Sequence, residues 1–458
     1  MKIKDNCQNK KISDIINKKV DNIDDLLYIS GKSIKQIAEE NKNFFIFPPN
    51  LSKREDDVDN LYICNISFDG ENKPNKITTY NLMGFVGKNE TTLNIYSRFS
   101  NKTNENDYFL YYMLQKIYHL NIINLMHTIK NGNIWDFYLM IFPYYLNRAL
   151  KQGLYKKYVE NKFNDSKIKG VIDVARHLKL NNPFIGNVAY NVREHSFDNE
   201  VTQLIRHTIE FIKRNVIGKS ILRNEKETID NVNRIIYATP TYNFRDRTKV
   251  INKNIKLKKH PYFTYYTDLQ SLCIKILKHY KVDYGQDKDN KIYGIIFDGA
   301  WLWEEYINIV LKQSKNFKFE HPQNKNKEGA INLFSNNNQY KIYPDFYYKD
   351  KDKSIVLDAK YKKLISDKID IDDMHQIITY MHTLEAKKGC FIYPQKKEEN
   401  KDNFKIGEIG ELKGYGGIVY KIPFSVPQQE DSDDFKFYQD EMNKSEKFFI
   451  ENIDKFGI

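Results

Sequence analysis

The chain has 458 residues, a length that indicates two to four domains, each able to bury a hydrophobic core. Its hydrophobic fraction of 41% and aromatic fraction of 14% are too high for an intrinsically disordered protein. A formal net charge of +12 favours polyanionic partners such as nucleic acid, although a lysine-rich solvated surface explains the charge equally well.

The cysteines and the hydropathy pattern indicate a reduced protein outside the membrane. The four cysteines are widely separated: Cys7, Cys64, Cys273 and Cys390. They form no CxxC pair, so neither a zinc knuckle nor a disulfide framework is expected. The most apolar window, residues 134–146, is interrupted by Asp136 and Pro143 and is too short to span a bilayer. We therefore expect a cytoplasmic protein with no membrane partner.

Residues 1–150 predict a β-rich and helical N-terminal domain. A short helix is expected over residues 33–40, in a polar opening segment. Short β-branched and aromatic runs follow, separated by Gly, Asn, Asp and Pro, a spacing typical of a small barrel or curled sheet. These runs are residues 44–48, 61–66, 77–80 and 93–96, with a turn into a further strand at 81–87. From Asp107 the apolar spacing becomes helical.

Residues 151–290 predict a mostly helical middle region. The basic, polar segment 151–169 is expected to be a connection between modules. Helices are expected over residues 201–216, 224–237 and 262–280, and Asp198 or Asn199 can cap the first of them. Arg245 and Arg247 lie in a cationic segment with aromatic residues, which makes them candidates for contacts with a DNA backbone; a solvated loop is the alternative.

Residues 291–458 predict an α/β domain. Helices are expected over 301–313 and 370–385, and strands over 340–343, 355–360 and 390–393, the last ended by Pro394. This order of elements is typical of an α/β sandwich with a mixed central sheet. The tail, residues 431–456, predicts an acidic helix whose apolar stripe packs on the preceding domain: Phe435, Tyr438, Met442 and Phe449.

The strongest candidate for chemistry lies around the predicted strand 355–360. Asp345 comes before the strand, and Asp358 and Lys360 end it. Since side chains alternate along a strand, Asp358 and Lys360 face the same side. Two carboxylates can hold Mg²⁺, or Mn²⁺ in its place, with waters left for a substrate, and a lysine can orient or deprotonate the attacking water. The pattern predicts metal-assisted phosphodiester hydrolysis, although an Asp-x-Lys triplet alone is common.

Neighbouring residues can complete such a site. Gln376 and Tyr380 are four apart on a predicted helix and share one face, so that Gln376 can orient the water or Lys360 while Tyr380 contacts the DNA phosphate or packs beside the site. An ordinary amphipathic helix is the alternative. Glu304 can supply a third carboxylate; the adjacent Glu305 is the other choice and is expected to face elsewhere on the helix. The sequence has no P-loop motif and no HExxH pattern, so binding of GTP through a P-loop and a zinc-protease site are not expected.

These motifs resemble those of a known family. Pro344-Asp345, Asp358-Ala-Lys-Tyr361 and Gln376-xxx-Tyr380 are similar to the PD-(D/E)xK nuclease superfamily in its QxxxY variant. Residues 297–306 resemble the LFExY helix that precedes the nuclease core in McrC proteins, with Trp303 in place of the usual Phe. Residues 169–200 resemble a second McrC pattern, and residues 81–99 resemble the N-terminal section of the LlaJI-type branch.

The resemblance implies the nuclease subunit of a McrBC-like restriction system. Such a subunit cuts double-stranded DNA with its C-terminal module, while its N-terminal module binds an AAA+ GTPase hexamer similar to McrB and stimulates it, so that GTP acts only through the partner. Carried over by motif, the metal ligands are Asp345, Asp358 and the backbone carbonyl of Ala359, with Glu304 as a possible fourth. Lys360 becomes the catalytic lysine and Gln376 the positioning residue. Two alternatives remain open: a stand-alone repair or recombination nuclease, and an inactive scaffold that binds DNA or a partner.

Overall fold

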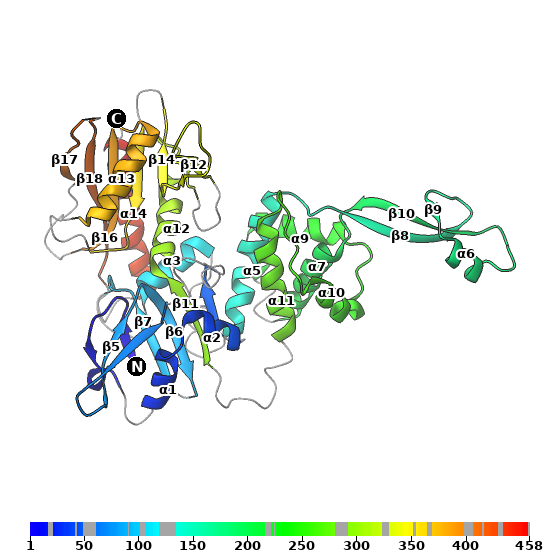
Figure 1. The fold of residues 1–458 in the computed structure, drawn as a ribbon, viewed down its shortest axis with the longest axis horizontal. Helices are drawn as coiled ribbons and strands as arrows, with labels where there is room; N and C mark the ends of the chain where they lie inside the picture. Colours follow the sequence, from blue (N-terminus) through cyan, green and yellow to red (C-terminus); the bar gives the residue numbers. More distant parts are fainter. Residues whose placement is uncertain are drawn as a thin grey trace. The chain divides into compact units, whose positions relative to one another are not determined.

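The structure is a computed structural model that describes most of the chain (Figure 1). The described residues are 1–16, 22–41, 44–48, 61–89, 91–100, 107–118, 134–215, 221–223, 225–279, 292–322, 329–350, 354–363, 369–397, 406–414, 416–428 and 434–456. The chain forms two compact units, one of residues 1–127 and 288–458 and the other of residues 128–287. No helix among the described residues is long and apolar enough to cross a membrane.

The first unit begins with a five-stranded sheet. Its strand order is β1 (Lys2–Lys4), β7 (Thr91–Tyr96), β6 (Leu82–Lys88), β11 (Ile292–Asp298) and β3 (Phe44–Phe47). A smaller sheet contains β2 (Lys10–Lys11), β5 (Pro74–Thr79) and β4 (Cys64–Phe68), and three helical segments accompany the two sheets: η1 (Ile12–Asp14), α1 (Ile23–Ser30) and α2 (Ile34–Glu40). Aliphatic side chains from both sheets and both α-helices form one buried core. The predicted strands and the predicted helix at 33–40 are therefore present, and Ser33 caps α2.

The strand β11 reaches this sheet from the distant half of the chain. It pairs antiparallel with β6 and parallel with β3, so it lies inside the N-terminal sheet although it comes after the predicted boundary at residue 290. Gly84 and Gly294 let β6 and β11 approach closely, because a Cβ at Gly84 would lie 2.1 Å from the Ile295 carbonyl oxygen. Helix α12 (Gly299–Leu311) starts directly after β11, with Asp298 as its N-cap. The N-terminal sheet thereby fixes the start of α12.

A second five-stranded sheet of this unit is mixed, as predicted. Its order is β14 (Phe346–Tyr348), β15 (Ile355–Ala359), β16 (Lys388–Lys396), β18 (Ile418–Val426) and β17 (Gly407–Glu411). β15, β16 and β18 are parallel, and the two edge strands are antiparallel to their neighbours. The predicted strand at 340–343 belongs instead to a separate hairpin of β12 (Ile331–Asn332) and β13 (Lys341–Ile342).

Helices cover both faces of the mixed sheet. Helix α13 (Ile371–Leu384) packs on Val356 and Phe391. On the opposite face, Phe424 contacts Trp303 of α12 and Phe449 of the tail helix α14 (Phe435–Phe456). The predicted apolar stripe of the tail is buried, which confirms its packing role. Helix α3 (Tyr108–Tyr118) joins α12 and α14 through the buried Glu446 carboxylate, which accepts hydrogen bonds from the hydroxyls of Tyr112 (2.8 Å) and Tyr306 (2.9 Å).

The prediction that Pro394 ends its strand is wrong. β16 continues to Lys396, and Pro394 pairs with Phe424 of β18. The Lys360 amide donates to the Ile392 carbonyl, so Ile392 faces β15, and Pro394, two residues later, faces the same way. β15 ends at Ala359, opposite Ile392. The missing amide hydrogen of Pro394 therefore falls beyond the end of the neighbouring strand, where no ladder bond is lost.

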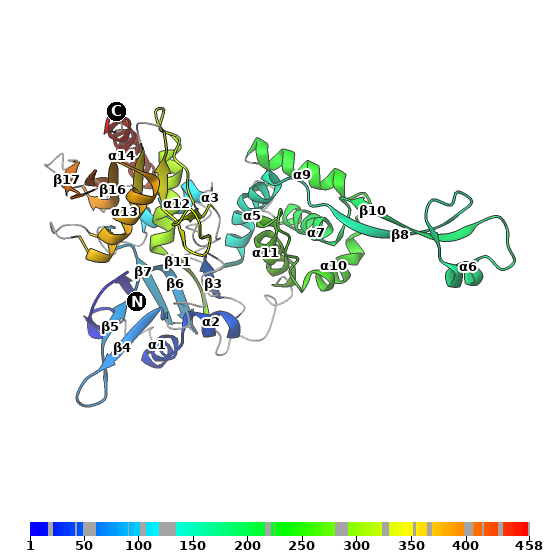
Figure 2. The ribbon, with the colours of Figure 1, turned by 45° about the horizontal axis from the view of Figure 1, so that its top comes forward.

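The second unit combines helices with a long antiparallel ribbon (Figure 2). Its helical segments are α5 (Ile134–Lys151), α7 (Glu200–Arg214), α9 (Lys226–Ala238), η3 (Phe244–Asp246), α10 (Arg247–Asn254) and α11 (Tyr265–His279). β8 (Lys157–Asp165) and β10 (Val188–Ser196) pair along their whole length and carry β9 (Val171–Ile172) and α6 (Val174–Leu180). Figure 2 shows this ribbon, with α6 near its far end, extending away from α5, α7, α9, α10 and α11 of the same unit.

The ribbon corrects one expectation for the middle of the chain. The segment 151–169 is not a simple connection, because β8 occupies its central part, and the ribbon stands beside the helices of this region. Side chains of β8 alternate only between half-buried and exposed, so an apolar period is missing from its sequence. Pairing with β10, rather than burial of an apolar face, makes this segment a strand.

Candidate active site

The site is built where β15 ends. The residues of β15 are all buried, so Asp358 is carried into the interior with 1% of its surface exposed. Lys360 follows the strand and places its Nζ 2.8 Å from Asp358 Oδ2, as their shared face predicts. An uncompensated carboxylate would be very costly at such a depth, and the Lys360 ammonium supplies the compensating charge.

The carboxyl group of Asp358 is strongly perturbed. Burial, followed by the negative charge of Asp345, raises its pKa to about 7, although Lys360 acts in the opposite direction. Neither oxygen of Asp358 accepts a hydrogen bond from a described residue, so its contact with Lys360 is an ion pair outside hydrogen-bond geometry. A buried carboxylate with open lone pairs is suited to a bound cation.

Asp345 lies beside the same strand end. Its Oδ2 accepts a hydrogen bond of 2.7 Å from the backbone amide of Ala359. The Lys360 amide points the other way, toward the Ile392 carbonyl of β16. Because the amide and carbonyl of one strand residue point to the same side, the Ala359 carbonyl faces the side of Asp345. The structure thus brings Asp345, Asp358 and the Ala359 carbonyl to one corner of the sheet.

Helix α13 holds Lys360 in place. Lys360 Nζ donates to Gln376 Oε1 at 2.8 Å and lies 3.2 Å from Asp373 Oδ1. Gln376 Nε2 in turn donates to the hydroxyl of Tyr380 at 2.7 Å. Burial lowers the pKa of Lys360, but the charges of Asp358 and Asp373 outweigh burial and raise the pKa above its usual range. Lys360 is therefore an ammonium donor in this geometry.

A pocket opens beside this chain of contacts. It has a volume of about 430 Å³, and the residues that line it come from the β13 segment and α13: Lys341, Ile342, Tyr343, His375, Gln376, Thr379 and Tyr380. Tyr380, a candidate DNA contact, is mostly covered, with 6% of its surface exposed. Gln376 lines the pocket and also binds Lys360. A ligand that fills the pocket would therefore lie next to the Lys360 ammonium group.

The glutamates of α12 approach the site through a histidine that the sequence did not indicate. His321 Nδ1 lies 2.7 Å from the backbone carbonyl of Asp345, and its ring stacks on Phe346. His321 Nε2 is 3.9 Å from Glu304 Oε1 and 3.8 Å from Glu305 Oε1. Burial lowers the pKa of His321, but Glu305 and the Asp345 carbonyl raise it overall. Glu305 thus meets the same imidazole as Glu304 and does not face elsewhere on the helix.

Two residues of the site, Asp373 and His321, were not predicted from the sequence, and only Asp373 carries a sequence signal. Asp373 is three residues before Gln376 on α13, so helical spacing already places it on the face of Gln376. His321 lies 24 residues before Asp345 in a segment without regular structure, and no periodicity marks it. Only the folded chain shows that it supports the Asp345 backbone.

The residue after Lys360 fixes the site to the N-terminal sheet. The Tyr361 hydroxyl lies 2.7 Å from Ser97 Oγ, just after β7. Its ring contacts Phe99 edge-on at 5.1 Å, and the guanidinium of Arg98 lies 4.8 Å from the ring centre. Arg98 is itself held by the buried Asp5, with Nε 2.9 Å from Oδ2. Residues that follow β7 of the N-terminal sheet therefore help to set the position of Lys360 at the end of the mixed sheet.

Part of the donor set at this corner fits the divalent metal ion that the motifs predict. Two carboxylates and a carbonyl are hard oxygen donors of the kind that Mg²⁺ and Mn²⁺ prefer. Within the described ranges, no group of three or more His, Cys, Asp or Glu side chains is arranged to hold a metal ion. Water and substrate oxygens would have to complete the coordination, as is usual for Mg²⁺.

Arg245 and Arg247, the other candidate DNA contacts, belong to the second unit. Arg245 is exposed at η3. Arg247 donates to the Leu277 carbonyl at 2.5 Å and lies 5.0 Å from the centre of the Phe211 ring. These contacts give Arg247 a role in helix packing, and a role in DNA binding stays a prediction for both residues.

The fold and this corner define an α/β protein with an Asp–Asp–Lys centre at the end of a mixed sheet. Residues 77–394 match the family model described as McrBC 5-methylcytosine restriction system component. The match spans more than half of the chain, and the chain therefore belongs to this family. The resemblance predicted from the motifs is confirmed at that level.

Comparisons with individual proteins add little. No curated protein matches the chain. A refined half-complex of Thermococcus gammatolerans McrB AAA+ hexamers with bound McrC, from a tetradecameric assembly, has 16% identity and a TM-score of 0.46, covering 100% of this chain and 99% of that one. A cryo-EM structure of the Thermococcus gammatolerans McrBC complex has 15% identity and a TM-score of 0.30, covering 68% and 87%. Both TM-scores are below 0.5, so neither likeness establishes a shared fold.

Proposed function

We propose that the chain is the DNA endonuclease subunit of a McrBC-type restriction system, acting with Mg²⁺ or Mn²⁺ on double-stranded DNA. The observation that supports this proposal most strongly is the convergence of Asp345, Asp358 and Lys360 at one strand end, with Gln376 bound to the lysine. Membership of a restriction-system family supports the same conclusion.

Each residue has a distinct task in this mechanism. Asp345, Asp358 and the Ala359 carbonyl would hold the metal ion. When bound, the ion would polarise the scissile phosphate and lower the pKa of an attacking water. The Lys360 ammonium offsets the negative charge that develops on the phosphate. Gln376 and Asp373 hold this ammonium at a fixed position, so that little reorganisation is needed during the reaction.

Glu304, predicted as a further carboxylate ligand, acts indirectly in this proposal. Its carboxylate lies next to His321, which contacts the backbone of Asp345. Glu305 and the Asp345 carbonyl favour a protonated imidazole, and Glu304 Oε1 lies 3.9 Å from the same imidazole nitrogen, Nε2. Through His321, the two glutamates of α12 therefore help to fix the backbone position of Asp345.

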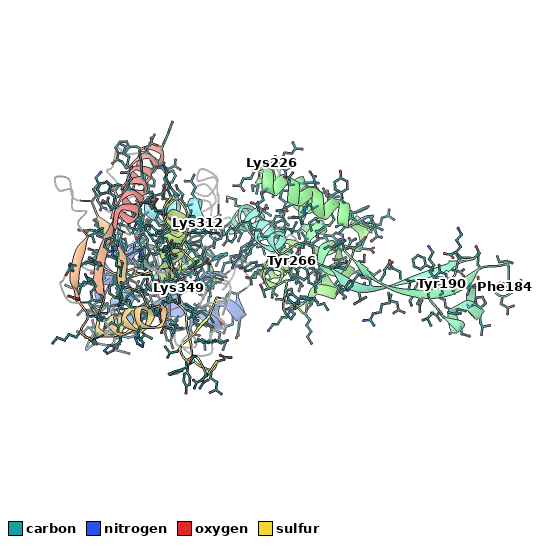
Figure 3. All side chains as sticks on the ribbon, turned by 90° about the horizontal axis from the view of Figure 1, so that it is seen from above. Phe184, Tyr190, Lys226, Tyr266, Lys312 and Lys349 are labelled. Carbon is teal, nitrogen blue, oxygen red and sulfur yellow. The ribbon has the colours of Figure 1, made fainter. Side chains whose placement is uncertain are left out.

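The ribbon of the second unit is the part that we assign to the AAA+ GTPase partner. Figure 3 labels Phe184, at the end of the ribbon away from its own helices, and Tyr190, which lies on β10. Large apolar side chains here are strongly exposed, led by Val171 (79%), Ile185 (78%) and Phe184 (64%). Exposed apolar side chains gathered on one element mark a binding surface for another protein.

This assignment moves partner binding away from the N-terminal module of residues 1–150, to which the family resemblance assigned it. In the described part of that segment, the exposed large hydrophobic residues are Tyr28, Tyr62 and Phe68, all at 50% or less. Replacing Val171, Phe184 and Ile185 together by Ser should weaken stimulation of the partner GTPase at least tenfold, with unchanged thermal unfolding. Unchanged stimulation would place the partner elsewhere.

Cleavage by the reconstituted complex tests the nuclease assignment. Lys360→Ala and Asp358→Ala should each lower Mg²⁺-dependent cleavage by at least about 100-fold, the usual effect of removing a group that stabilises transition-state charge. Lys349→Ala, at an exposed lysine beside β14, is the matched control and should leave cleavage unchanged. Intact cleavage by either site variant would refute the assignment. Efficient cleavage by the chain alone, with no partner or nucleotide, would favour a stand-alone repair nuclease.

A further inference from the structure

The short hairpin of β12 and β13 lies against helix α13. Ile331 and Ile342 pair across the hairpin, and both pack on the apolar core that α13 shares with the mixed sheet. The β13 segment therefore forms a second wall beside α13, and the pocket of about 430 Å³ lies between the two. This volume falls within the usual range of ligand-binding pockets.

The pocket adjoins the candidate active site through both of its walls. On one wall, Tyr343 is two residues before Asp345. On the other, Gln376 accepts a hydrogen bond from Lys360 and donates one to the Tyr380 hydroxyl. A single amide group thus separates the Lys360 ammonium from the Tyr380 hydroxyl. A ligand in the pocket and a scissile phosphate at Lys360 would therefore be direct neighbours.

The pocket offers mainly hydrogen-bond donors, and none of its lining residues is Asp or Glu. Among the described residues, neither the exposed Lys341 ammonium nor the Tyr343 hydroxyl has an ion-pair or hydrogen-bond partner. The Tyr380 hydroxyl accepts from Gln376, so its own hydrogen is free to be donated, and burial keeps it protonated by raising the pKa of Tyr380 to about 12. Donors without acceptors favour a negatively charged ligand rich in oxygen atoms.

We propose that this pocket binds the nucleotide next to the scissile phosphate of the DNA strand. The inference rests on the proposed nuclease function and assigns the pocket to the same substrate. The Lys341 ammonium pairs with the phosphate of this nucleotide, and the hydroxyls of Tyr343 and Tyr380 donate to its oxygens. Ile342 offers an apolar wall to the sugar. Because these contacts are made to the backbone, the pocket holds the strand without reading its sequence.

Histidine labelling of the reconstituted complex tests the pocket without cleavage. His375 and His382 are both exposed on α13, but only His375 lines the pocket. In EDTA, which prevents metal-dependent cleavage, a DNA duplex should slow the acylation of His375 by diethyl pyrocarbonate and leave that of His382 unchanged. Equal protection of both histidines, or of neither, would overturn the proposal. Protection of His375 by inorganic phosphate as strong as that by the duplex would overturn the assignment to DNA.

Cleavage kinetics separate this inference from the nuclease assignment. Lys341→Gln should raise the KM for DNA about tenfold with kcat nearly unchanged, and it should reduce the slope of log affinity against log salt by roughly one, because one phosphate contact is lost. Lys341→Arg should restore the KM, and Lys349→Gln, at the exposed lysine beside β14, should leave it unaltered. If the wild-type complex cleaves DNA but Lys341→Gln has a normal KM and salt slope, the nucleotide site is refuted. If the wild-type complex does not cleave DNA, the proposed function itself fails.

Discussion

The buried carboxyl group of Asp358, when ionised, should destabilise the metal-free protein. Replacement of Asp358 by Asn tests this effect. Its pKa is raised from 3.8 to about 7. One pKa unit corresponds to about 1.4 kcal/mol, so ionising this group in the folded state costs roughly 4 kcal/mol. Asn resembles the neutral carboxyl group and removes that cost. Because the shift already includes the attraction of Lys360, we expect a gain of up to roughly 4 kcal/mol at pH 8.

The pH dependence follows from the direction of the shift. Between about pH 4 and pH 7 the folded protein holds a proton on Asp358 that the unfolded chain has released. The free energy of unfolding therefore falls as the pH rises through this window, and Asp358→Asn removes this fall. The advantage of the variant should be largest at pH 8 and smaller at pH 5.

Urea unfolding in EDTA at pH 8 and pH 5 measures both effects. Asp372→Asn, at an exposed carboxylate on α13, is the control and should change the stability by less than about 0.5 kcal/mol. Adding Mg²⁺ should stabilise the wild-type protein but not Asp358→Asn, since metal binding to the folded state raises its stability. If Asp358→Asn is less stable than the wild type at pH 8, burial does not destabilise the ionised Asp358. The same conclusion follows if its gain in the free energy of unfolding is equal at pH 8 and pH 5.

Three further substitutions test the support around the site. Gln376→Ala should lower kcat by roughly 10- to 100-fold with little change in KM, because Lys360 loses the group that positions it; steady-state cleavage assays measure this. Tyr361→Phe should reduce the free energy of unfolding by about 1–2 kcal/mol through loss of the contact with Ser97, as seen in thermal unfolding, and an unchanged stability would mean that the contact is not formed. Glu446→Ala should cost about 3–5 kcal/mol in urea unfolding, because two tyrosine hydroxyls and a lysine lose their buried acceptor.

The chain by itself determined the parts of the site that depend on local spacing. Asp358 and Lys360 face one side because a strand alternates, and Gln376 and Tyr380 meet because a helix repeats every 3.6 residues. Both relations hold in the folded protein, where Gln376 contacts Lys360 and Tyr380. Such relations depend on the geometry of a single element, so a few neighbouring residues suffice to predict them.

Only the tertiary structure decided what surrounds those elements. β11 enters the N-terminal sheet from 200 residues away, and β8 is a strand because β10 pairs with it. His321 reaches the Asp345 carbonyl from an irregular segment, and Lys4 reaches the Ser100 carbonyl that Lys396 also binds. Each of these contacts joins residues whose separation along the chain leaves no periodic signal. The free energy that forms them comes from packing and pairing of whole elements, which no local pattern encodes.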